Sequence, residues 1–296
     1  MTAPTLLAKN LTLGFHGHAG LSQVLHGISL HIEAGERVAL VGESGSGKSV
    51  TARIILGLLQ AQKSAHIAGL LAFEGRDLEK MPARERHALR GAKMSMISQD
   101  PTSSLNPVFR ISTQFHEVLR RADPRLGGAQ ARERAAAALL GVSISDPGRV
   151  LNSYSFQLSG GMNQRVMIAM ALANEPTLLI ADEPGTALDV TVQAQTLGLM
   201  RDLVAKRGAA VLFISHNLGV VREFADRVYV IYRGRIVEQG PTAGIFDDPR
   251  HPYTRALLRA APRITGGGIP DIDDVSEDYL APRIVHDGYG EPGEAS

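Results

Sequence analysis

The sequence predicts an α/β protein with a mostly parallel sheet, an antiparallel β rim and an inserted helical subdomain. Three observations indicate this fold class. Short apolar segments typical of strands alternate with segments of helical periodicity. A glycine-rich segment stands between one of these strands and a helix. Residues from about 100 to 165 differ from the rest, because Pro, Gly and Ser divide much of this region into short helical pieces.

The first part of the chain has the patterns of strands. Residues 28–32 alternate apolar and polar side chains, as a half-buried strand does. A turn over residues 33–36 leads into an apolar strand, residues 37–41, which ends at Gly42. From Lys48 onward the apolar residues recur with helical spacing. We therefore expect a strand, a glycine-rich turn and a helix in direct succession.

Further elements are expected within the inserted subdomain and in the α/β core that resumes after it. Five further elements are expected, namely helices at residues 111–121 and 130–140, a helix from Met162, and strands at residues 178–181 and 211–215. Residues 229–232 and 235–238, on either side of Gly234, predict a hairpin at the rim.

The composition limits the possible classes of function. Of the 296 residues, 44% are hydrophobic, which is enough for a substantial core. The 31 basic and 30 acidic residues give a net charge of +1, which is not the electrostatic footprint of a nucleic-acid-binding protein. The absence of Cys excludes disulfides, iron–sulfur clusters and Cys-based zinc sites. No signal peptide is indicated, and the longest apolar run, residues 166–173, is shorter than the ~18 residues of a membrane-spanning helix, so we expect any such spans on other chains.

Residues 42–49, GESGSGKS, match the phosphate-loop pattern G-x-x-x-x-G-K-[ST]. The expected ATP-binding residues are Gly42, Glu43, Ser44, Gly45, Ser46, Gly47, Lys48 and Ser49, followed by Val50 in the helix. The glycines let successive backbone N–H groups point at phosphate oxygens, and the N-terminus of the helix adds a partial positive charge. Lys48 is expected to reach the β- and γ-phosphates, and the Ser49 hydroxyl to hold Mg²⁺. This segment predicts a P-loop NTPase core.

Four predicted strands end at groups that can handle phosphate, metal or water. The first ends at the phosphate loop, and the others are followed by Gln99, by Asp182 and Glu183, and by His216. Ligands of open α/β sheets bind at the carboxyl ends of the strands, so we expect these residues to surround the nucleotide. Asp182 would hold Mg²⁺ through a water, and Glu183 would be the general base that polarises the attacking water.

The remaining roles at these strand ends are less specific. Gln99 is expected near the metal or the attacking water, and His216 near the γ-phosphate. Two alternatives stay open: Asp182 and Glu183 could form an ordinary turn before Pro184, and His216 could be a half-buried histidine whose hydrogen bonds are already satisfied.

A second segment also has the features of an anion site. Ser159, Gly160 and Gly161 precede a predicted helix, with Ser159 as a plausible cap and the glycines permitting close backbone approach. The first loop already accounts for one nucleotide. We therefore expect the second segment to serve the ATP of a partner chain, with ATP enclosed between two chains arranged head to tail.

Taken together, these segments resemble the nucleotide-binding subunit of an ABC (ATP-binding cassette) transporter over roughly residues 5–262. The resemblance rests, in chain order, on GESGSGKS at residues 42–49, SQDP at 98–101, LSGGM at 158–162, LLIADEP at 178–184, ALD at 187–189 and SH at 215–216. It implies one nucleotide-binding domain over residues 1–262, with the helical subdomain at about 100–165. Residues 263–296, which are Gly-rich and then acidic, are expected to form a loosely ordered tail.

The resemblance also implies roles for individual residues. Ser159 and the two glycines after it would contact the γ-phosphate across the dimer, and residues 187–189, with Asp189, would link the two sites. Gln99 and the subdomain after it would couple the nucleotide state to the membrane subunits. Phe15 stands roughly where the family stacks an aromatic ring on adenine, although a core or surface Phe is the alternative there.

Finer features are similar to the peptide/nickel import group of this family. They are QDPTSSLNP at residues 99–107, SGGMNQRVMIAMALA at 159–173, ALDVTVQAQ at 187–195 and HPYTRALL at 251–258. This implies import of peptides, nickel, opines or similar solutes. It further implies a second ATPase subunit, two transmembrane permease subunits, a solute-binding protein, and a peripheral location on the cytoplasmic face of the cell membrane.

Two features depart from the family pattern. Gly185 stands where Ser or Thr usually follows the Glu-Pro pair, and we expect it to add backbone freedom beside the general base. The cysteine cluster that the import group often carries near its C-terminus is absent, so no iron–sulfur centre is expected.

A soluble ABC ATPase of DNA repair or translation is the alternative function. Such proteins usually carry coiled-coil arms, zinc sites or two cassettes, and none of these is visible in this sequence. A kinase or GTPase on the same loop is disfavoured by LSGGM and by the lack of an Asn-Lys-x-Asp motif.

Overall fold

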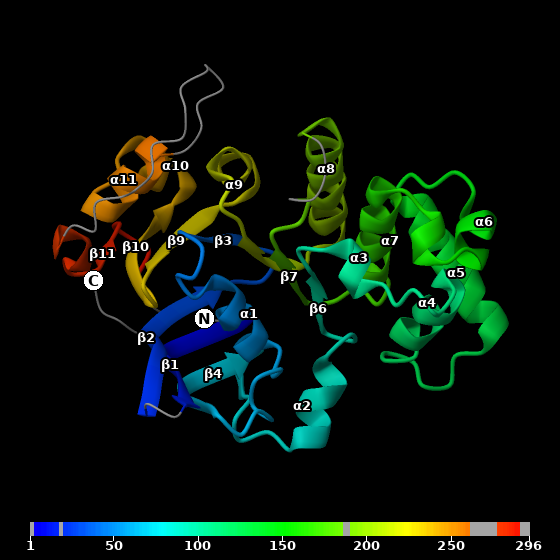
Figure 1. Ribbon diagram of the computed structural model, residues 1–296, viewed down its shortest axis with the longest axis horizontal. Coiled ribbons are helices and arrows are strands. Elements are labelled where there is room, and N and C mark those ends of the chain that lie inside the picture. The colour runs from blue at the N-terminus through cyan, green and yellow to red at the C-terminus, as the bar shows by residue number, and fades with distance from the viewer. Residues whose placement is uncertain (1–2, 18–19, 186–189, 261–276, 291–296) are drawn as a thin grey trace. The chain divides into compact units, whose positions relative to one another are not determined.

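A computed structural model describes residues 3–17, 20–185, 190–260 and 277–290. The chain forms two compact units, which we describe separately (Figure 1). Unit 1 comprises Met1–Met81 and Leu212–Ser296, and unit 2 comprises Pro82–Val211. Unit 2 is therefore an insertion between two segments of unit 1.

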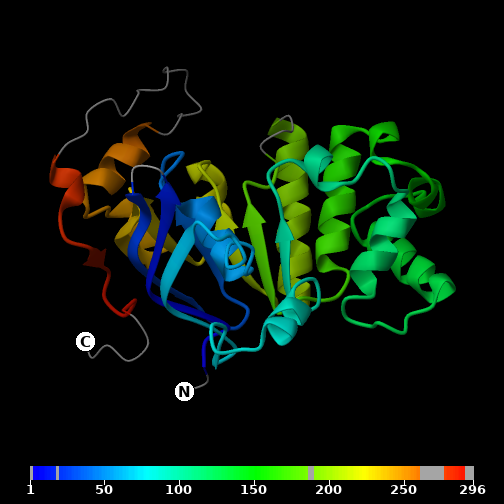
Figure 2. The same cartoon turned by 60° about the horizontal axis from the view of Figure 1, so that its bottom comes forward.

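Unit 1 contains a four-stranded antiparallel sheet in the order β2-β1-β4-β5 (Figure 2). Its strands are β1 (Leu6–Gly17), β2 (Gly20–Ile32), β4 (Ala65–Phe73) and β5 (Arg76–Asp77). Along β1, buried and more exposed side chains alternate over much of the strand, as expected where one face of a sheet packs on a core. Strand β2 begins at Gly20, earlier than the predicted residues 28–32. Bulges opposite β1 interrupt the alternation of its side chains, so the sequence pattern indicated only the last part of the strand.

Four more strands of unit 1 lie in the second sheet: β3 (Arg37–Val41), β9 (Arg227–Tyr232), β10 (Arg235–Pro241) and β11 (Ile284–Val285). Strands β3 and β9 are parallel and nearly continuous in apolar residues, as is usual for strands buried on both faces. Strand β10 returns antiparallel to β9, which confirms the predicted hairpin, and β11 adds parallel to β10.

The helices of unit 1 come from both of its chain segments, with α1 in the first and the others in the second (Figure 1). They are α1 (Lys48–Ile55), α9 (Leu218–Phe224), α10 (Thr242–Asp247), α11 (Pro252–Ala260) and the 3₁₀ helix η2 (Glu277–Leu280). Helix α9 begins at a cap in which the Asn217 side chain accepts a hydrogen bond from the Val220 amide.

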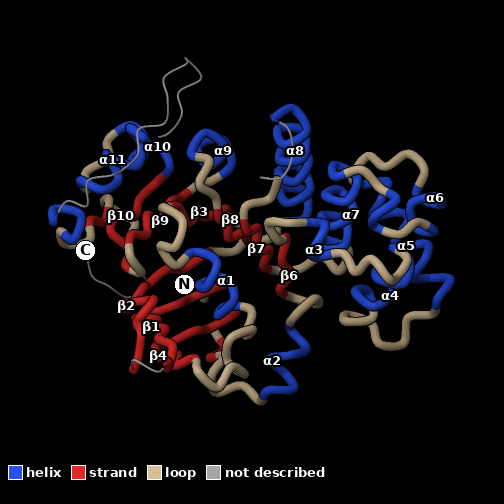
Figure 3. Tube along the Cα trace, viewed as in Figure 1, coloured by secondary structure: helices blue, strands red, loops and turns tan. Residues whose placement is uncertain are grey.

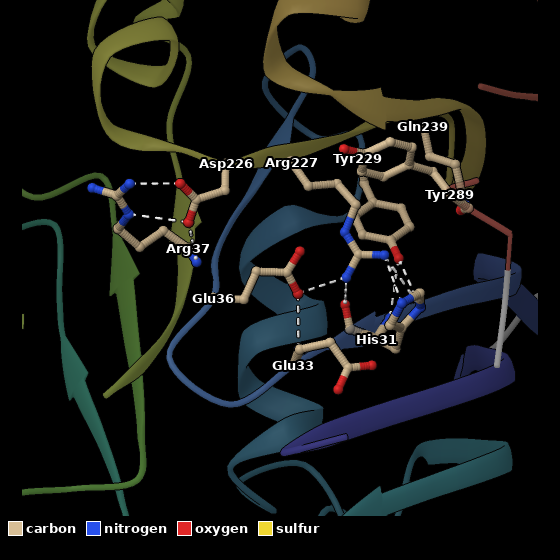
Figure 4. A network of polar contacts seen from close by, with 9 residues as sticks. All are labelled: His31, Glu33, Glu36, Arg37, Asp226, Arg227, Tyr229, Gln239 and Tyr289. Atoms are coloured by element: carbon tan, nitrogen blue, oxygen red, sulfur yellow. Dashed lines mark hydrogen bonds and ion pairs between the residues drawn. The ribbon is translucent and has the colours of Figure 1, made fainter. Parts of the chain in front are cut away.

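A buried network centred on Arg227 connects β9 to the turn between β2 and β3 (Figure 4). The guanidinium donates to the Glu36 carboxylate at 2.7 Å and to the His31 carbonyl oxygen at 2.9 Å, and it contacts His31 Nε2 at 2.6 Å. The Tyr229 hydroxyl accepts a hydrogen bond from the His31 amide. The network thus joins the turn that precedes β3 to β9, the strand that pairs with β3 in the sheet.

We expect Arg227→Ala to lower the free energy of unfolding by about 2 kcal/mol, because it leaves Glu36 and the His31 carbonyl without their charged partner in a largely dry site. The Arg227 side chain is only 3% exposed. Arg222→Ala is the matched control, since Arg222 pairs with Asp247 at 2.7 Å but is 59% exposed. For the control, urea denaturation should show a loss of less than about 1 kcal/mol in the free energy of unfolding. An equal loss for both substitutions would contradict the stabilising role of the network.

Unit 2 combines two parallel strands with a group of helices (Figure 3). Strands β6 (Met94–Ile97) and β7 (Leu178–Asp182) pair in parallel. The helices are α2 (Ala83–Leu89), α3 (Pro101–Ser104), α4 (Ile111–Leu119), α5 (Gly128–Gly141), α6 (Pro147–Asn152), η1 (Ser155–Gln157), α7 (Gly160–Leu172) and α8 (Val190–Arg207). Helix α5 packs against α4, α6 and α7. Strand β8 (Ala210–Ile214) spans the boundary between the units.

The predicted α/β fold with inserted helices is confirmed, and apart from the early start of β2 the predicted strands and helices lie within a few residues of the observed ones. The described C-terminal segment also differs from the sequence expectation. Residues 277–290 belong to the region for which we expected a loosely ordered tail, yet they contain η2 and β11 and pair with β10. Among the described residues, no helix is long and apolar enough to span a bilayer.

Candidate functional site

The phosphate loop of unit 1 runs from the end of β3 to the start of α1. Lys48 is 5% exposed, and its Nζ atom donates to the carbonyl oxygens of Gly42 and Glu43, both at 2.7 Å. The lysine thus reaches back over the loop and holds its first two residues. The side-chain oxygen of Ser46 is buried without a hydrogen-bond partner in the structure, as expected of a loop group that a phosphate would complete.

The loop is also anchored by residues distant in the chain. The Gly234 amide donates to the Ser46 carbonyl oxygen at 2.9 Å, and the Glu43 amide donates to the Tyr253 hydroxyl at 3.1 Å. These contacts place the loop against the β9–β10 turn and helix α11. The sequence reasoning missed both Gly234 and Tyr253 as loop-supporting residues. In the sequence, Tyr253 lies in the HPY segment that is similar to the import group, and Gly234 lies at the centre of the predicted hairpin, but neither position indicates a contact with the loop.

Two further candidates lie in unit 1. His216 follows β8 and is exposed, next to Ser215, whose hydroxyl accepts from the Asn217 amide at 3.0 Å. Phe15 is half-buried on β1, opposite Ser22 of β2 and Ala65 of β4. A half-buried ring at the end of the antiparallel sheet is available to stack on a ligand, and His216 is accessible to one.

Unit 2 brings Gln99 and Glu183 together. They follow the adjacent parallel strands β6 and β7, in which Ile97 lies opposite Ala181. The Gln99 amide nitrogen donates to a Glu183 carboxylate oxygen at 3.1 Å. Asp182, the last residue of β7, is 7% exposed. The side chains of Gln99 and Glu183 therefore meet beyond the carboxyl ends of β6 and β7, and Asp182 directly precedes Glu183.

The backbone of Glu183 is unusual. Its φ of 49° lies in the left-handed region, which non-glycine residues seldom adopt. Such conformations concentrate at functional sites, where surrounding structure holds a side chain in a required direction. Gly185, two residues on, has a φ of 95°, so glycine matches the backbone of this turn.

The second anion-binding candidate forms the N-terminus of α7 in unit 2. The Ser159 side chain accepts a hydrogen bond from the Met162 amide at 3.3 Å and caps the helix. Ser159 and Gly160 are exposed, so this helix end is open to a ligand from outside. The predicted linking segment, residues 187–189 with Asp189, lies outside the described residues.

The candidate residues therefore fall into two groups. Lys48, Ser49, His216 and Phe15 belong to unit 1, while Gln99, Asp182, Glu183 and the start of α7 belong to unit 2. That the two groups meet around one nucleotide stays a prediction. The group in unit 1 provides loop N–H groups and the Lys48 ammonium, which can bind phosphate oxygens. The group in unit 2 provides side-chain oxygens that can bind a metal ion or a water.

Comparison with known protein families identifies two matching regions. Residues 25–186 match the family described as ABC transporter. Residues 237–277 match the family described as oligopeptide/dipeptide transporter, C-terminal region.

Similar proteins carry related names. The chain is 49% identical over 276 residues to the peptidoglycan transport ATP-binding protein YejF of Agrobacterium fabrum, covering 93% of this chain but only 50% of that protein. It is 46% identical to the oligopeptide transport ATP-binding protein OppD of Bacillus subtilis, covering 89% of this chain and 73% of that one. The dipeptide transport ATP-binding protein DppD of B. subtilis is 43% identical, with 94% and 83% covered.

A solved structure is similar in fold. It is the dimeric ATP-binding cassette MJ0796 in a post-hydrolysis state bound to ADP and Pi, with a TM-score of 0.71 and 27% identity. The match covers 80% of this chain and 98% of that chain.

Proposed function

This chain belongs to the ABC transporter family as an ATP-binding subunit, and on that premise we propose that it is the ATP-hydrolysing motor of a peptide importer. The observation that carries the proposal is the pair formed by Gln99 and Glu183 at the ends of two parallel strands, in a chain that also carries a complete phosphate loop. ATP binding would close two cassettes on each other, and hydrolysis would reopen them.

Each candidate residue has a defined part in this proposal. The backbone amides of residues 42–49 bind the phosphates of ATP, and Lys48 moves its ammonium from the loop carbonyls to the β- and γ-phosphate oxygens. Glu183 accepts a proton from the attacking water while Gln99 holds its carboxylate in position. His216 senses the γ-phosphate, and Phe15 stacks on the adenine.

The residues present suit Mg²⁺. The candidate ligands are the Ser49 hydroxyl, the Gln99 side-chain oxygen and, through water, the Asp182 carboxylate. These are hard oxygen donors, and Mg²⁺ is usually bound by few protein groups together with substrate phosphates. Bound there, Mg²⁺ would neutralise charge that develops on the β- and γ-phosphates.

The expected partners are inferred from the exposed N-terminus of α7 and from the similar proteins. Ser159, Gly160 and Gly161 would contact the γ-phosphate bound by a second cassette, with Asp189 linking the two sites, and the related cassette of known structure is dimeric. Two permease subunits and a solute-binding protein would complete the assembly. The chain would lie on the cytoplasmic face of the membrane, where ATP is supplied.

Peptides are the solute class best supported. Two relatives are named for oligopeptide and dipeptide transport, and residues 237–277 match the C-terminal region of that transporter group. Nickel, opines and other small solutes are the competing cargo within the same group.

Uptake by a deletion strain tests the proposal. We expect loss of radiolabelled tripeptide uptake on deletion, recovery with the wild-type chain, and no recovery with Lys48→Ala expressed at the same level, because removal of the ammonium leaves the triphosphate without its closest cation. Wild-type purified protein should also bind and hydrolyse Mg-ATP. If deletion left tripeptide uptake unchanged and abolished nickel uptake, nickel would be assigned as the cargo in place of peptides. If the purified protein did not bind ATP, the motor role itself would be contradicted.

A further inference from the structure

The described C-terminal residues 277–290, here called the strap, are docked on β10. Ile284 and Val285 pair in parallel with Glu238 and Gln239, and the His286 amide donates to the Gln239 carbonyl oxygen at 2.9 Å. The Gln239 side chain also bonds to the Tyr289 carbonyl oxygen (Figure 4). These backbone and side-chain contacts hold the strap to β10.

One buried carboxylate joins the strap to the start of α11. Glu238 is 0% exposed. One of its oxygens accepts from the Arg250 amide at 2.8 Å and contacts His286 Nε2 at 2.9 Å, and the other accepts from the His251 amide at 3.1 Å. The position of the strap and the position of the first turn of α11 are thus determined by the same group.

The first turn of α11 carries Tyr253, which reaches the phosphate loop. Tyr253 is 0% exposed, and its hydroxyl accepts the hydrogen bond from the Glu43 amide. Its own amide donates to His251 Nδ1 at 3.2 Å. Burial lowers the pKa of His251, which favours the neutral ring that can accept this bond. Glu43 is in turn held by Lys48 through its carbonyl oxygen, so both ends of this loop residue are fixed.

The strap contacts the ring of Tyr253 directly. Tyr279 packs edge-on against Tyr253, with ring centroids 5.6 Å apart and planes at 70°. It packs in the same way against Tyr232, at 5.8 Å and 85°, and Tyr232 and Tyr253 lie 4.4 Å apart. The three rings form a cluster in which Tyr253 is restrained from the strap side, an arrangement that favours a single ring orientation.

We propose that the strap positions the phosphate loop for ATP, with Tyr279 and Tyr253 as positioning residues. The restraint passes from the Tyr279 ring to the Tyr253 ring, and from the Tyr253 hydroxyl to the Glu43 amide at the beginning of the loop. Neither tyrosine touches the reacting atoms. The inference rests on the proposed function, because it concerns how the same loop binds ATP.

Tyr253→Phe in the full-length chain is the decisive substitution. It removes the hydroxyl and keeps the ring, so we expect the Kd for a fluorescent ATP analogue and the KM for ATP to rise about three- to tenfold, the loss expected for one hydrogen bond. kcat should stay within about twofold, because the Gln99–Glu183 pair is unchanged. Tyr279→Ala should raise Kd in the same direction, and Tyr279→Phe, which keeps the ring, should leave it unchanged.

Tyr229→Phe separates positioning from general destabilisation. Tyr229 is also fully buried, and its hydroxyl likewise accepts from a backbone amide, but that amide belongs to His31 of β2, whereas the Tyr253 hydroxyl bonds to a residue of the loop. This variant should lower the melting temperature with wild-type Kd for the nucleotide. In the double variant Tyr253→Phe/Tyr279→Ala, Kd should rise by less than the product of the single effects, because both act through one contact.

The outcomes distinguish the two levels of the hypothesis. A wild-type chain that binds no ATP would contradict the proposed function. A wild-type chain that binds ATP, with Tyr253→Phe folded and equal to it in Kd and KM, would overturn the role of the strap. An equal rise in Kd for Tyr229→Phe would overturn it as well.

Discussion

Glu183→Gln should bind ATP as tightly as the wild-type chain and hydrolyse it at least about a hundredfold more slowly, which is the usual contribution of a positioned general base. The amide keeps the size of the side chain and an oxygen that can accept from Gln99 Nε2, the contact seen at 3.1 Å. What it loses is the ability to take a proton from water. The measurements are nucleotide affinity and steady-state phosphate release in the assembled transporter.

Glu175→Gln is the matched control for this substitution. Glu175 precedes β7 while Glu183 follows it, and both have left-handed backbones, with φ of 50° and 49°. Glu175 is exposed at the opposite end of the strand from the candidate site. Its replacement should leave turnover unchanged. Turnover by Glu183→Gln close to that of this control would mean that another group deprotonates the water.

Gly42→Ala should lower the free energy of unfolding by about 3 kcal/mol or more and abolish ATP binding at micromolar nucleotide. A Cβ atom at Gly42 would lie 2.1 Å from the Ile231 carbonyl oxygen, which belongs to the backbone of β9 and cannot rotate away. Relief of this overlap would shift the start of the phosphate loop, including the carbonyl that Lys48 contacts. Thermal denaturation and equilibrium nucleotide binding measure the two effects.

Gly45→Ala in the same loop separates the effect of steric overlap from the effect of backbone strain. Gly45 has a φ of 78°, so alanine there is also strained, but an added Cβ would meet nothing within 4 Å. We expect a loss of about 1 to 2 kcal/mol, from backbone strain alone. If both alanine variants lost the same stability, the close approach of β9 to Gly42 would not be what requires glycine at that position.

The sequence by itself predicted the phosphate-loop motif and the gathering of Gln99 and Glu183 at one edge of the sheet. The loop is readable because its chemistry depends on neighbouring residues whose spacing is visible in the chain. The gathering at one edge is readable because parallel strands bring the residues that follow them to the same edge, even when 84 positions separate them, whereas the hydrogen bond between Gln99 and Glu183 was seen only in the structure.

Only the tertiary structure decided what supports the loop from outside. The Tyr253 hydroxyl and the Glu43 amide are 210 positions apart, and no periodicity relates them. The sequence did not predict the strap as ordered structure, because a two-residue strand is too short to show alternation. The segment also contains few large apolar residues, which is the composition of a polar tail. Local chemistry follows from local spacing, whereas contacts between distant segments follow from how the core packs. That packing places Tyr279 of the strap against Tyr253, whose hydroxyl bonds to the phosphate loop.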